Sequence, residues 1–427
     1  MEQALFAQFH LVPMGLKERT MSSVLCGLAL ACLAAALALA AAAPAGSAGS
    51  EAPKAWPVGK TYEMKGLKVT LSAPVLVGEQ KMAGKEWFWY PQVARLSSGD
   101  LLAVTRLGPD NLEADAVSKI GFSWSDDGGL TWSATKALNK GHGYSSLTLP
   151  NGDLLMLPFI LYRRGDALVG PANVISKTGR EVKFIENAVE VTGWPRPDAH
   201  FAPSNVAEAA RFGYAAFFFN GQTVRLKDGK YLATLYGSYK DDKKFTLVAA
   251  ESADGMKWKL RSTIAGPECP EGGMLGPCES AIARLKDGRI MCVFGQASPY
   301  GQCFSEDEGK SWTKPARMPA GVGGVEPSLA VMKDGTVVLS GGNRQATLWF
   351  NPEGDGKEWQ GINVYEHHNA VVAPERRFGG KAPYNGCTGY TEVVATEDNS
   401  VVLIYDCMNA GGNFTICVAR ATLGKTR

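Results

Sequence analysis

The sequence predicts an all-β fold: a six-bladed β-propeller in which each blade is a four-stranded antiparallel sheet. Three observations lead to this prediction. The chain of 427 residues is rich in glycine, with 49 copies, and shows little helical periodicity. A polar turn followed by an apolar strand occurs six times, and an acidic turn that ends in tryptophan recurs in the same units. Radial packing of such units leaves only short sheet edges, and a long all-β chain often forms a single domain.

The first repeated motif marks one hairpin in each predicted blade. It carries Asp-Gly, Asn-Gly or a related pair, and another apolar strand precedes it in each unit. Asp-Gly and Asn-Gly between two strands favour a tight hairpin, because both central residues take positive φ. Repeats of this kind are the sequence signature of propellers and solenoids. The copies begin at Ser97, Pro150, Lys227, Lys286, Lys333 and Glu397.

The second repeated motif is a structural staple. SDDGGLTW at 125–132 and SEDEGKSW at 305–312 place Ser, Asp, Gly and Trp at the same four positions, and degenerate copies begin at Ser252 and Asn351. The aspartate can accept hydrogen bonds from the N–H groups of its own turn, glycine supplies the unusual backbone angle, and the tryptophan ring covers the hairpin. A calcium loop would need a longer and denser ligand set with flanking helices.

The N-terminal residues 1–49 are expected to form an export signal and linker outside the fold. Lys17 and Arg19 precede a Leu/Ala-rich run over residues 24–43, and small residues follow. This order is typical of a secretory signal peptide. The run is also long enough to cross a bilayer, so a retained N-terminal anchor is the alternative. Residues 50–427 are then expected to form a single propeller that is secreted or periplasmic.

Charge and cysteine content limit the partners and the chemistry. The net charge is +2 at pH 7 with no polybasic run, which argues against nucleic acid or an anionic membrane as a partner. Export would permit disulfides, and buried free thiols are the alternative. None of the cysteines has C-x-x-C metal spacing. The cysteines beyond the N-terminal segment are Cys269, Cys278, Cys292, Cys303, Cys387, Cys407 and Cys417.

Repeats of S-x-D-x-G-x-x-W on a predicted six-bladed propeller resemble the sialidase (neuraminidase) superfamily, in which this turn is called the Asp box. The resemblance covers the chain from about Trp87 to the C-terminus. CTGYTEVVATEDNSVVLIYD at 387–406 is similar to the segment that carries the nucleophilic tyrosine, which implies that role for Tyr390. GPCESAIARLKDG likewise implies Glu279 as its base. Sialidases are an exception to the two-carboxylate scheme of glycosidases.

The resemblance also implies an acid/base residue and substrate contacts. The acid/base aspartate of the family precedes the first Asp box by about ten residues, which implies Asp115 in this role. Asp110 is the alternative to Asp115 and is otherwise expected to bind substrate. Arg106, at the end of the strand LLAVTR, matches a substrate-contacting arginine. Arg344, in LSGGNRQATLWF, matches one of the three arginines that hold the substrate carboxylate.

Two of those three arginines are absent from this chain. Trp89 stands in FWYP where the family has the first, and CVFGQAS offers Gly295 or Gln296 where it has the second. Arginine suits carboxylates because it forms bidentate, charge-assisted hydrogen bonds. At about 1.5–3 kcal/mol per charged hydrogen bond, the loss of two arginines weakens carboxylate binding by several kcal/mol. Trp89 could instead stack on an apolar sugar face.

Other polar residues are secondary candidates for the pocket, because loops often carry function. Two adjacent histidines without a third ligand at workable spacing make a poor zinc site. These candidates are Arg196, Asp198 and His200 in WPRPDAHF, His142 and Tyr144 in GHGY, His367 and His368 in VYEHHN, and Glu326 in GVEPSLAVMKDG.

The first hypothesis combines the predicted export signal with the resemblance: an exported, exo-acting, retaining glycoside hydrolase of sialidase type. It is expected to be a monomer that acts on a glycan and needs no cofactor or metal ion. A second hypothesis is a carbohydrate-binding propeller that has lost catalysis, because Trp89 and Gly295 replace two cations. A third is an enzyme that acts on a neutral or differently charged sugar. Tyr390, Glu279 and Asp115 favour an enzyme.

Overall fold

The protein is nearly all-β, as the sequence predicts. The structure is a computed structural model, and all the residues that it describes belong to one compact unit. The expected export signal and the alternative anchor, residues 1–49, lie outside the described residues. In the described ranges, no helix is both long and apolar enough to cross a membrane. The described residues are 55–81, 88–107, 119–138, 143, 145–196, 199–200, 214–239, 242–342, 345–379 and 387–426.

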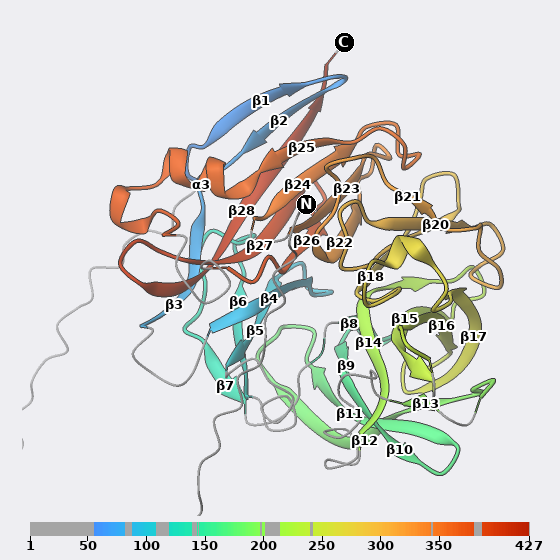
Figure 1. Ribbon diagram of the computed structural model, residues 1–427. Coiled ribbons are helices and arrows are strands. Elements are labelled where there is room, and N and C mark those ends of the chain that lie inside the picture. The colour runs from blue at the N-terminus through green and yellow to red at the C-terminus, as the bar shows by residue number, and fades with distance from the viewer. Residues whose placement is uncertain are drawn as a thin grey trace, which may run out of the picture. The chain divides into compact units, whose positions relative to one another are not determined.

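Three of the sheets are four-stranded and antiparallel, with strands that follow one another in chain order. These sheets have the architecture predicted for single blades (Figure 1). Their strands are β4 (Phe88–Arg95), β5 (Leu101–Leu107), β6 (Lys119–Ser125) and β7 (Lys136–Leu138); β18 (Ser280–Arg284), β19 (Ile290–Phe294), β20 (Gly301–Ser305) and β21 (Ala316–Arg317); and β22 (Val325–Val331), β23 (Val337–Gly342), β24 (Thr347–Asn351) and β25 (Gln360–Asn363).

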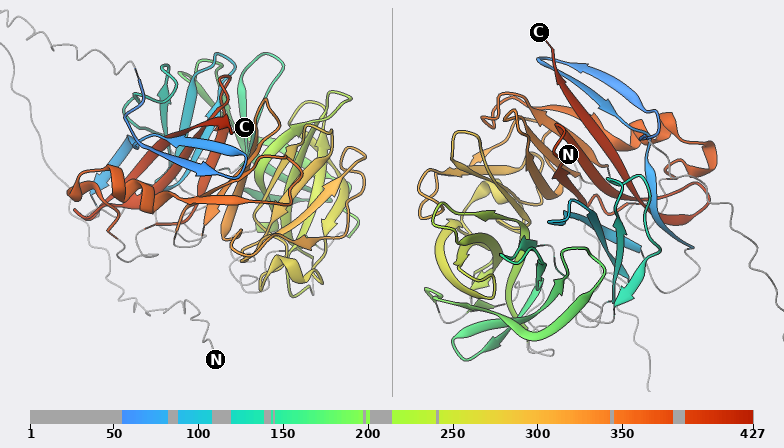
Figure 2. Two further views of the ribbon diagram at one scale, coloured as in Figure 1. Left: turned by 90° about the horizontal axis from the view of Figure 1, so that it is seen from above. Right: turned by 180° about the vertical axis from the view of Figure 1, so that it is seen from behind.

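A fourth sheet joins the two ends of the described chain. Its order is β1-β2-β28-β27-β26, and β3 pairs with another part of β28. The long last strand therefore holds strands from the start of the fold against the C-terminal hairpin, as Figure 2 shows for the blue and red strands. The strands are β1 (Lys60–Met64), β2 (Leu67–Leu71), β3 (Val75–Lys81), β26 (Thr391–Ala395), β27 (Ser400–Met408) and β28 (Asn413–Lys425).

The fifth sheet has ten strands and combines two of the predicted units. β12 pairs with β17 in parallel at their outer edges, and β10 pairs with both β11 and β14. Six separate blades are therefore not shown by the described sheets. The strands are β8 (Ser145–Thr148), β9 (Leu154–Leu157), β10 (Ile160–Arg164), β11 (Ala167–Ile175), β12 (Val182–Thr192), β13 (Ala199–His200), β14 (Tyr214–Arg225), β15 (Tyr231–Tyr239), β16 (Thr246–Ser252) and β17 (Lys257–Ala265).

The first strands of the successive units lie around a common centre. β14, β18, β22, β26 and β4 follow one another as neighbours, and β8 lies against β14 (Figure 1). β4, β8, β14 and β26 line a central cavity of about 580 Å³. The hydrophobic core lies between the faces of neighbouring sheets, so middle strands such as β15 and β27 are buried along their whole length.

Short helices occur in two of the connections. Asn363 caps the α-helix α3 (Val364–Val371) by accepting hydrogen bonds from the backbone N–H groups of Tyr365 and Glu366. An N-cap of this kind satisfies donors that have no partner inside the helix. The 3-10 helices are η2 (Pro270–Gly272) and η3 (Pro374–Arg376).

The repeated polar turns form hairpins, but with a different geometry from the one predicted. Only the last residue of each turn has positive φ, and the residue before it, which is Ser98 in the first turn and Asp or Asn in the others, does not. In the first turn, Gly99 N–H donates to Leu96 O and Leu96 N–H donates to Asp100 O. A turn that ends in one left-handed residue is the longer hairpin type with a glycine bulge. The left-handed residues are Gly99, Gly152, Gly229, Gly288, Gly335 and Asn399.

The aspartate of the second motif holds its own turn, as predicted. Asp307 accepts hydrogen bonds from Lys310 N–H at 3.0 Å, Ser311 N–H at 2.9 Å and the Ser305 hydroxyl at 2.9 Å. Burial opposes ionisation, but the hydrogen bonds from Ser311 and Ser305 outweigh it and lower the pKa of Asp307 to about 2. Trp312 Nε1–H donates to the Ser262 hydroxyl at 3.1 Å, which ties this turn to the next sheet.

The seven cysteines in the described part of the chain are all buried free thiols. Of the two alternatives left by the sequence, the structure therefore has the thiols. Cys292 and Cys303 are direct partners across β19 and β20. Cys407 and Cys417 lie on β27 and β28, two residues out of register.

Replacing Asp307 by alanine should lower the free energy of unfolding by about 1–3 kcal/mol, because the N–H groups of the turn lose their acceptor. Urea unfolding measures this difference. Glu306→Ala, which removes the exposed carboxylate next to it, should change stability by less than about 0.5 kcal/mol. Equal losses in the two variants would contradict the role of Asp307 as a staple.

Candidate active site

Tyr390 and Glu279 form a direct hydrogen bond near the centre of the fold. The phenolic Oη of Tyr390 lies 2.5 Å from Glu279 Oε1. Tyr390 comes just before β26 and Glu279 just before β18, so both stand where an inner strand begins. Glu279 is only 3% exposed, whereas Tyr390 is half-buried. The carboxylate is thus placed to take the phenolic proton from a side chain that reaches the surface.

Other donors fix the Glu279 carboxylate. Gln296 Nε2–H donates to Oε1 at 2.7 Å, and the backbone N–H of Glu326 donates to Oε2 at 3.0 Å. Glu279 has φ +36° and Glu326 has φ +41°. Non-glycine residues in this region are strained by about 1–3 kcal/mol, and such strain is concentrated at functional sites.

Glu326 is a second buried carboxyl beside Glu279. Its Oε1 accepts a hydrogen bond from Asn220 at 2.8 Å, while its Oε2 has no hydrogen-bond partner among the described residues. Burial, and then the charge of Glu279, raises the pKa of Glu326 well above its usual range. Two like charges so close are unfavourable, so Glu326 is the member of the pair that stays protonated.

Tyr90 on β4 and Arg106 on β5 lie beside the dyad. The rings of Tyr90 and Tyr390 meet edge to face with centroids 4.6 Å apart. The Arg106 guanidinium carbon lies 5.6 Å from the centre of the Tyr90 ring, and Arg106 is 2% exposed. Arg106 therefore lies one ring away from Tyr390, and its backbone pairs with that of Trp89. The side chain of Trp89 lies outside the described residues.

Asp406 on β27 holds the loop that carries Tyr390. It accepts hydrogen bonds from Thr388 N–H at 3.0 Å and from the Thr388 hydroxyl at 2.5 Å, and Thr388 Oγ1 accepts the N–H of Tyr390 at 3.2 Å. The backbone N–H of Tyr90 also donates to Asp406. Burial raises the pKa of Asp406 to about 6, although the bonds from Thr388 and Tyr90 oppose this. Asp406 thus positions both aromatic residues.

The structure also shows what surrounds three of the secondary candidates for the pocket. Arg196 pairs with Asp242 at 3.2 Å on the surface. His367 is buried between the Tyr62 hydroxyl and the Ser72 carbonyl, and His368 between the Tyr405 hydroxyl and the Arg376 carbonyl. Burial lowers the pKa of both histidines. Both histidines lie on α3, and they contact β1, the residue after β2, β27 and η3.

Several predicted site residues fall outside the described residues. Nothing in the structure tests their assigned roles. They are Asp115, Asp110 and Arg344, together with the secondary candidates His142, Tyr144 and Asp198; His200 is described only through its backbone in β13.

Three further residues were missed by sequence reasoning or had no role assigned. Gln296 was one of two residues at the place of a missing arginine, and the structure shows that its amide binds Glu279. Asn220, which contacts Glu326, lies within an apolar strand and has no motif around it. Asp406 ends the quoted segment 387–406, where its position on an otherwise apolar strand was the available signal.

Comparison with known proteins places the fold but not the family. No protein-family model and no curated protein matches the sequence. A protein of unknown function from Dyadobacter fermentans is similar at TM-score 0.61 and 17% identity, over 84% of this chain and all of that one. The α-L-arabinanase of Penicillium chrysogenum, complexed with arabinobiose, is similar at TM-score 0.52 and 16% identity, over 82% and 98% of the two chains.

A third solved structure is of the same kind. The GH93 α-L-arabinofuranosidase of Fusarium graminearum, also with arabinobiose, is similar at TM-score 0.53 and 14% identity, over 82% of this chain and 97% of that one. At these identities the likeness shows the fold alone, which is that of β-propeller glycosidases.

The elevated pKa of Asp406 should give stability a specific pH dependence. Because the folded value of about 6 exceeds the usual 3.8, the folded state holds an extra proton between these values. Its stabilising effect is complete below pH 4 and is lost as the pH rises to 6, at about 1.4 kcal/mol per pH unit. Urea unfolding of the wild type and Asp406→Asn at pH 4, 5 and 6 measures this. Parallel curves for the two proteins would show that Asp406 titrates at its ordinary pKa.

Proposed function

We propose that this chain is a retaining, exo-acting glycoside hydrolase with Tyr390 as nucleophile and Glu279 as its base. The observation that carries the proposal is the 2.5 Å hydrogen bond from the phenol to a buried carboxylate. A nucleophile within hydrogen-bond reach of a base, itself oriented by a third group, is the usual arrangement for covalent catalysis. Here Gln296 and the Glu326 backbone orient the base.

The chemistry requires two displacements. In the first, Tyr390 Oη attacks the anomeric carbon as Glu279 takes its proton, and the bond to the leaving oxygen breaks. The leaving oxygen takes a proton from an acid, the role proposed for Asp115. In the second, water attacks the anomeric carbon, Asp115 takes a proton from the water, and Glu279 returns a proton to the departing phenolate. Two inversions give net retention.

We propose an uncharged sugar as substrate. Gln296 is one of the two residues, with Gly295, at the place where the resemblance implies a carboxylate-binding arginine, and it donates to Glu279. A substrate carboxylate would then meet the negative charge of Glu279 with too few cations, and a buried charge without partners is costly. The Penicillium and Fusarium structures contain arabinobiose, a sugar without a carboxylate. This fits a site from which two arginines have been lost.

A second candidate is a carbohydrate-binding propeller without catalysis. The observation that favours it is the tight network around Glu279, which can be a structural anchor for the inner loops as well as a catalytic device. The two functions differ in one result: the binding protein retains sugar but does not cleave it.

The finer architecture and location belong to the same proposal. We propose six blades, with two of them joined in the ten-stranded sheet by the parallel pairing of β12 with β17. The proposal of export rests on the order of charged, apolar and small residues in 1–49, and we propose that the exported protein is a monomer. A secreted enzyme of this kind would meet glycans directly.

Replacing Tyr390 by phenylalanine should reduce kcat/KM for the best glycoside by at least about 10²-fold, because the nucleophilic oxygen is removed. Tyr62→Phe, which removes a phenol hydroxyl bonded to His367, should leave activity unchanged. Initial rates on fluorogenic glycosides measure both. An undiminished rate in Tyr390→Phe would exclude tyrosine from the mechanism.

The lost arginines should make α-sialosides poor substrates. In a panel that contains a sialoside, a uronic acid glycoside and neutral glycosides including α-L-arabinofuranoside, we expect turnover of a neutral member and little of the sialoside. A sialoside kcat/KM of about 10⁴ M⁻¹s⁻¹ or more, usual for working enzymes, would refute this selectivity. Binding of a neutral glycan without turnover of any member would instead establish the binding protein.

A further inference from the structure

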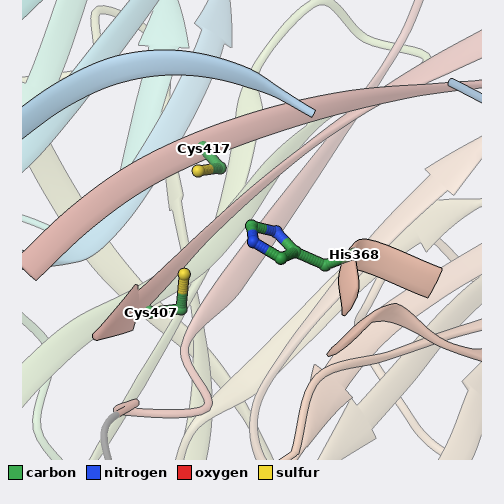
Figure 3. Close-up of side chains that lie close together, drawn as sticks. All are labelled: His368, Cys407 and Cys417. Carbon is green, nitrogen blue, oxygen red and sulfur yellow. The ribbon is translucent and has the colours of Figure 1, made fainter. Parts of the chain in front are cut away.

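One histidine and two cysteines from three different elements meet between α3 and the hairpin of β27 and β28. His368 on α3, Cys407 on β27 and Cys417 on β28 each place a ligand atom within 4.8 Å of the other two. Figure 3 shows the imidazole ring facing both sulfurs. All three side chains are at most 2% exposed. The two sulfurs come from adjacent strands, so the backbone of the sheet fixes their spacing.

The hydrogen bonds of His368 fix the tautomer of its ring. Nε2 lies 2.9 Å from the carbonyl of Arg376, which can only accept, so Nε2 carries the proton. Nδ1 then presents its lone pair, 2.8 Å from the hydroxyl of Tyr405. Metal-binding histidines usually donate their second N–H to a carbonyl or carboxylate in this way, which fixes the tautomer and the ring.

The cluster has a route to solvent. His368 and Cys417 both line a cavity of about 340 Å³, and the charged residues of its wall are Glu79, Glu375 and Arg376. Asn409 and Asn413 donate to Glu79, which fixes that carboxylate at the wall. A metal site in a folded protein needs an entry path, and acidic walls attract cations. The other cross-strand pair, Cys292 and Cys303, has no histidine in its group.

We propose that His368, Cys407 and Cys417 form a binding site for Zn²⁺. Two thiolates and a neutral imidazole are ligands that zinc prefers, and hard cations such as Mg²⁺ prefer oxygen. Charge selects between the soft ions. Zn²⁺ balances two thiolates, whereas Cu⁺ would leave a net negative charge in the core, which is costly.

The dimensions require only a small contraction. Tetrahedral zinc with bonds of about 2.3 Å to sulfur and 2.0 Å to nitrogen separates its ligand atoms by about 3.5–3.8 Å. The hydroxyl of Tyr405 then gives up its bond to Nδ1. Three protein ligands leave a fourth position, which a water molecule from the cavity can occupy. The ion ties α3 to β27 and β28, on the strand where Asp406 supports the Tyr390 loop.

The test uses the full chain, reduced and stripped of metal by a chelator. It is incubated with zinc chloride, passed through a desalting column and analysed for zinc. We expect the wild type to retain about one more zinc ion per chain than the double variant Cys407→Ala/Cys417→Ala. The matched control is Cys292→Ala/Cys303→Ala, which removes two equally buried thiols and should retain zinc as the wild type does. The cysteines outside the described residues are present in all three proteins, so any zinc that they bind is the same in each and does not affect the differences.

Two further measurements do not depend on whether the double cysteine variants fold. Cobalt loading of the wild type should give the thiolate-to-cobalt charge-transfer absorption, which a hydrogen-bonded thiol pair cannot produce. Tyr405→Phe removes the hydroxyl that competes for Nδ1 and should not weaken zinc binding, whereas His368→Gln should weaken it by about 100-fold or more.

Three results would overturn the proposal. The first is a reduced wild type that retains no more zinc than Cys407→Ala/Cys417→Ala. The second is a cobalt spectrum without charge transfer from sulfur. The third is zinc binding by His368→Gln that equals that of the wild type, which would exclude the imidazole as a ligand.

Discussion

The burial of the Glu279 carboxylate is the constraint on which the centre of this fold depends. A carboxylate that is 3% exposed must be supplied with hydrogen-bond donors, since an unpaired buried charge is costly. The donors come from different sheets: Gln296 after β19, the backbone of Glu326 in β22, and Tyr390 before β26. One side chain therefore sets the relative positions of three inner loops.

This requirement explains the unusual backbone of the inner strands. Glu326 can direct its N–H at Glu279 only with its own carboxyl buried nearby, and that carboxyl stays neutral because of burial and the neighbouring charge. Positive φ at both glutamates belongs to the same arrangement. Tyr390 and Tyr90 are held by a separate network, because Asp406 accepts hydrogen bonds from Thr388 and from the backbone N–H of Tyr90. Acid and phenol are thus supported by independent networks that meet at one hydrogen bond.

Local patterns in the sequence predicted much of the fold. The hairpins follow from polar turns whose glycine or asparagine takes a left-handed angle, and the staple follows from one aspartate that bonds residues within four positions. The pairing of β12 with β17 joins residues 67 positions apart, so no local pattern reports it. Its consequence is a ten-stranded sheet in place of two separate ones.

The sequence likewise predicted some residues of the candidate site and not others. Tyr390 and Glu279 were identified because each lies in a segment similar to one in a known superfamily, and the structure places their side chains together. Asp406 and Asn220 act through contacts that only folding creates. The same holds for His368, whose nearest sulfur ligands lie about 40 and 50 residues later in the chain. No spacing rule for metal motifs extends that far.

The pairing of β28 with β2 and β3 has a consequence for the order of biosynthesis. β28 is synthesised after all the other strands of the described chain, so β2 and β3 have no partner for their open edge until it leaves the ribosome. Unpaired edges invite association with other chains. The sheet is complete only once β28 has been made, and loss of β28 would leave β2 and β3 without their neighbour.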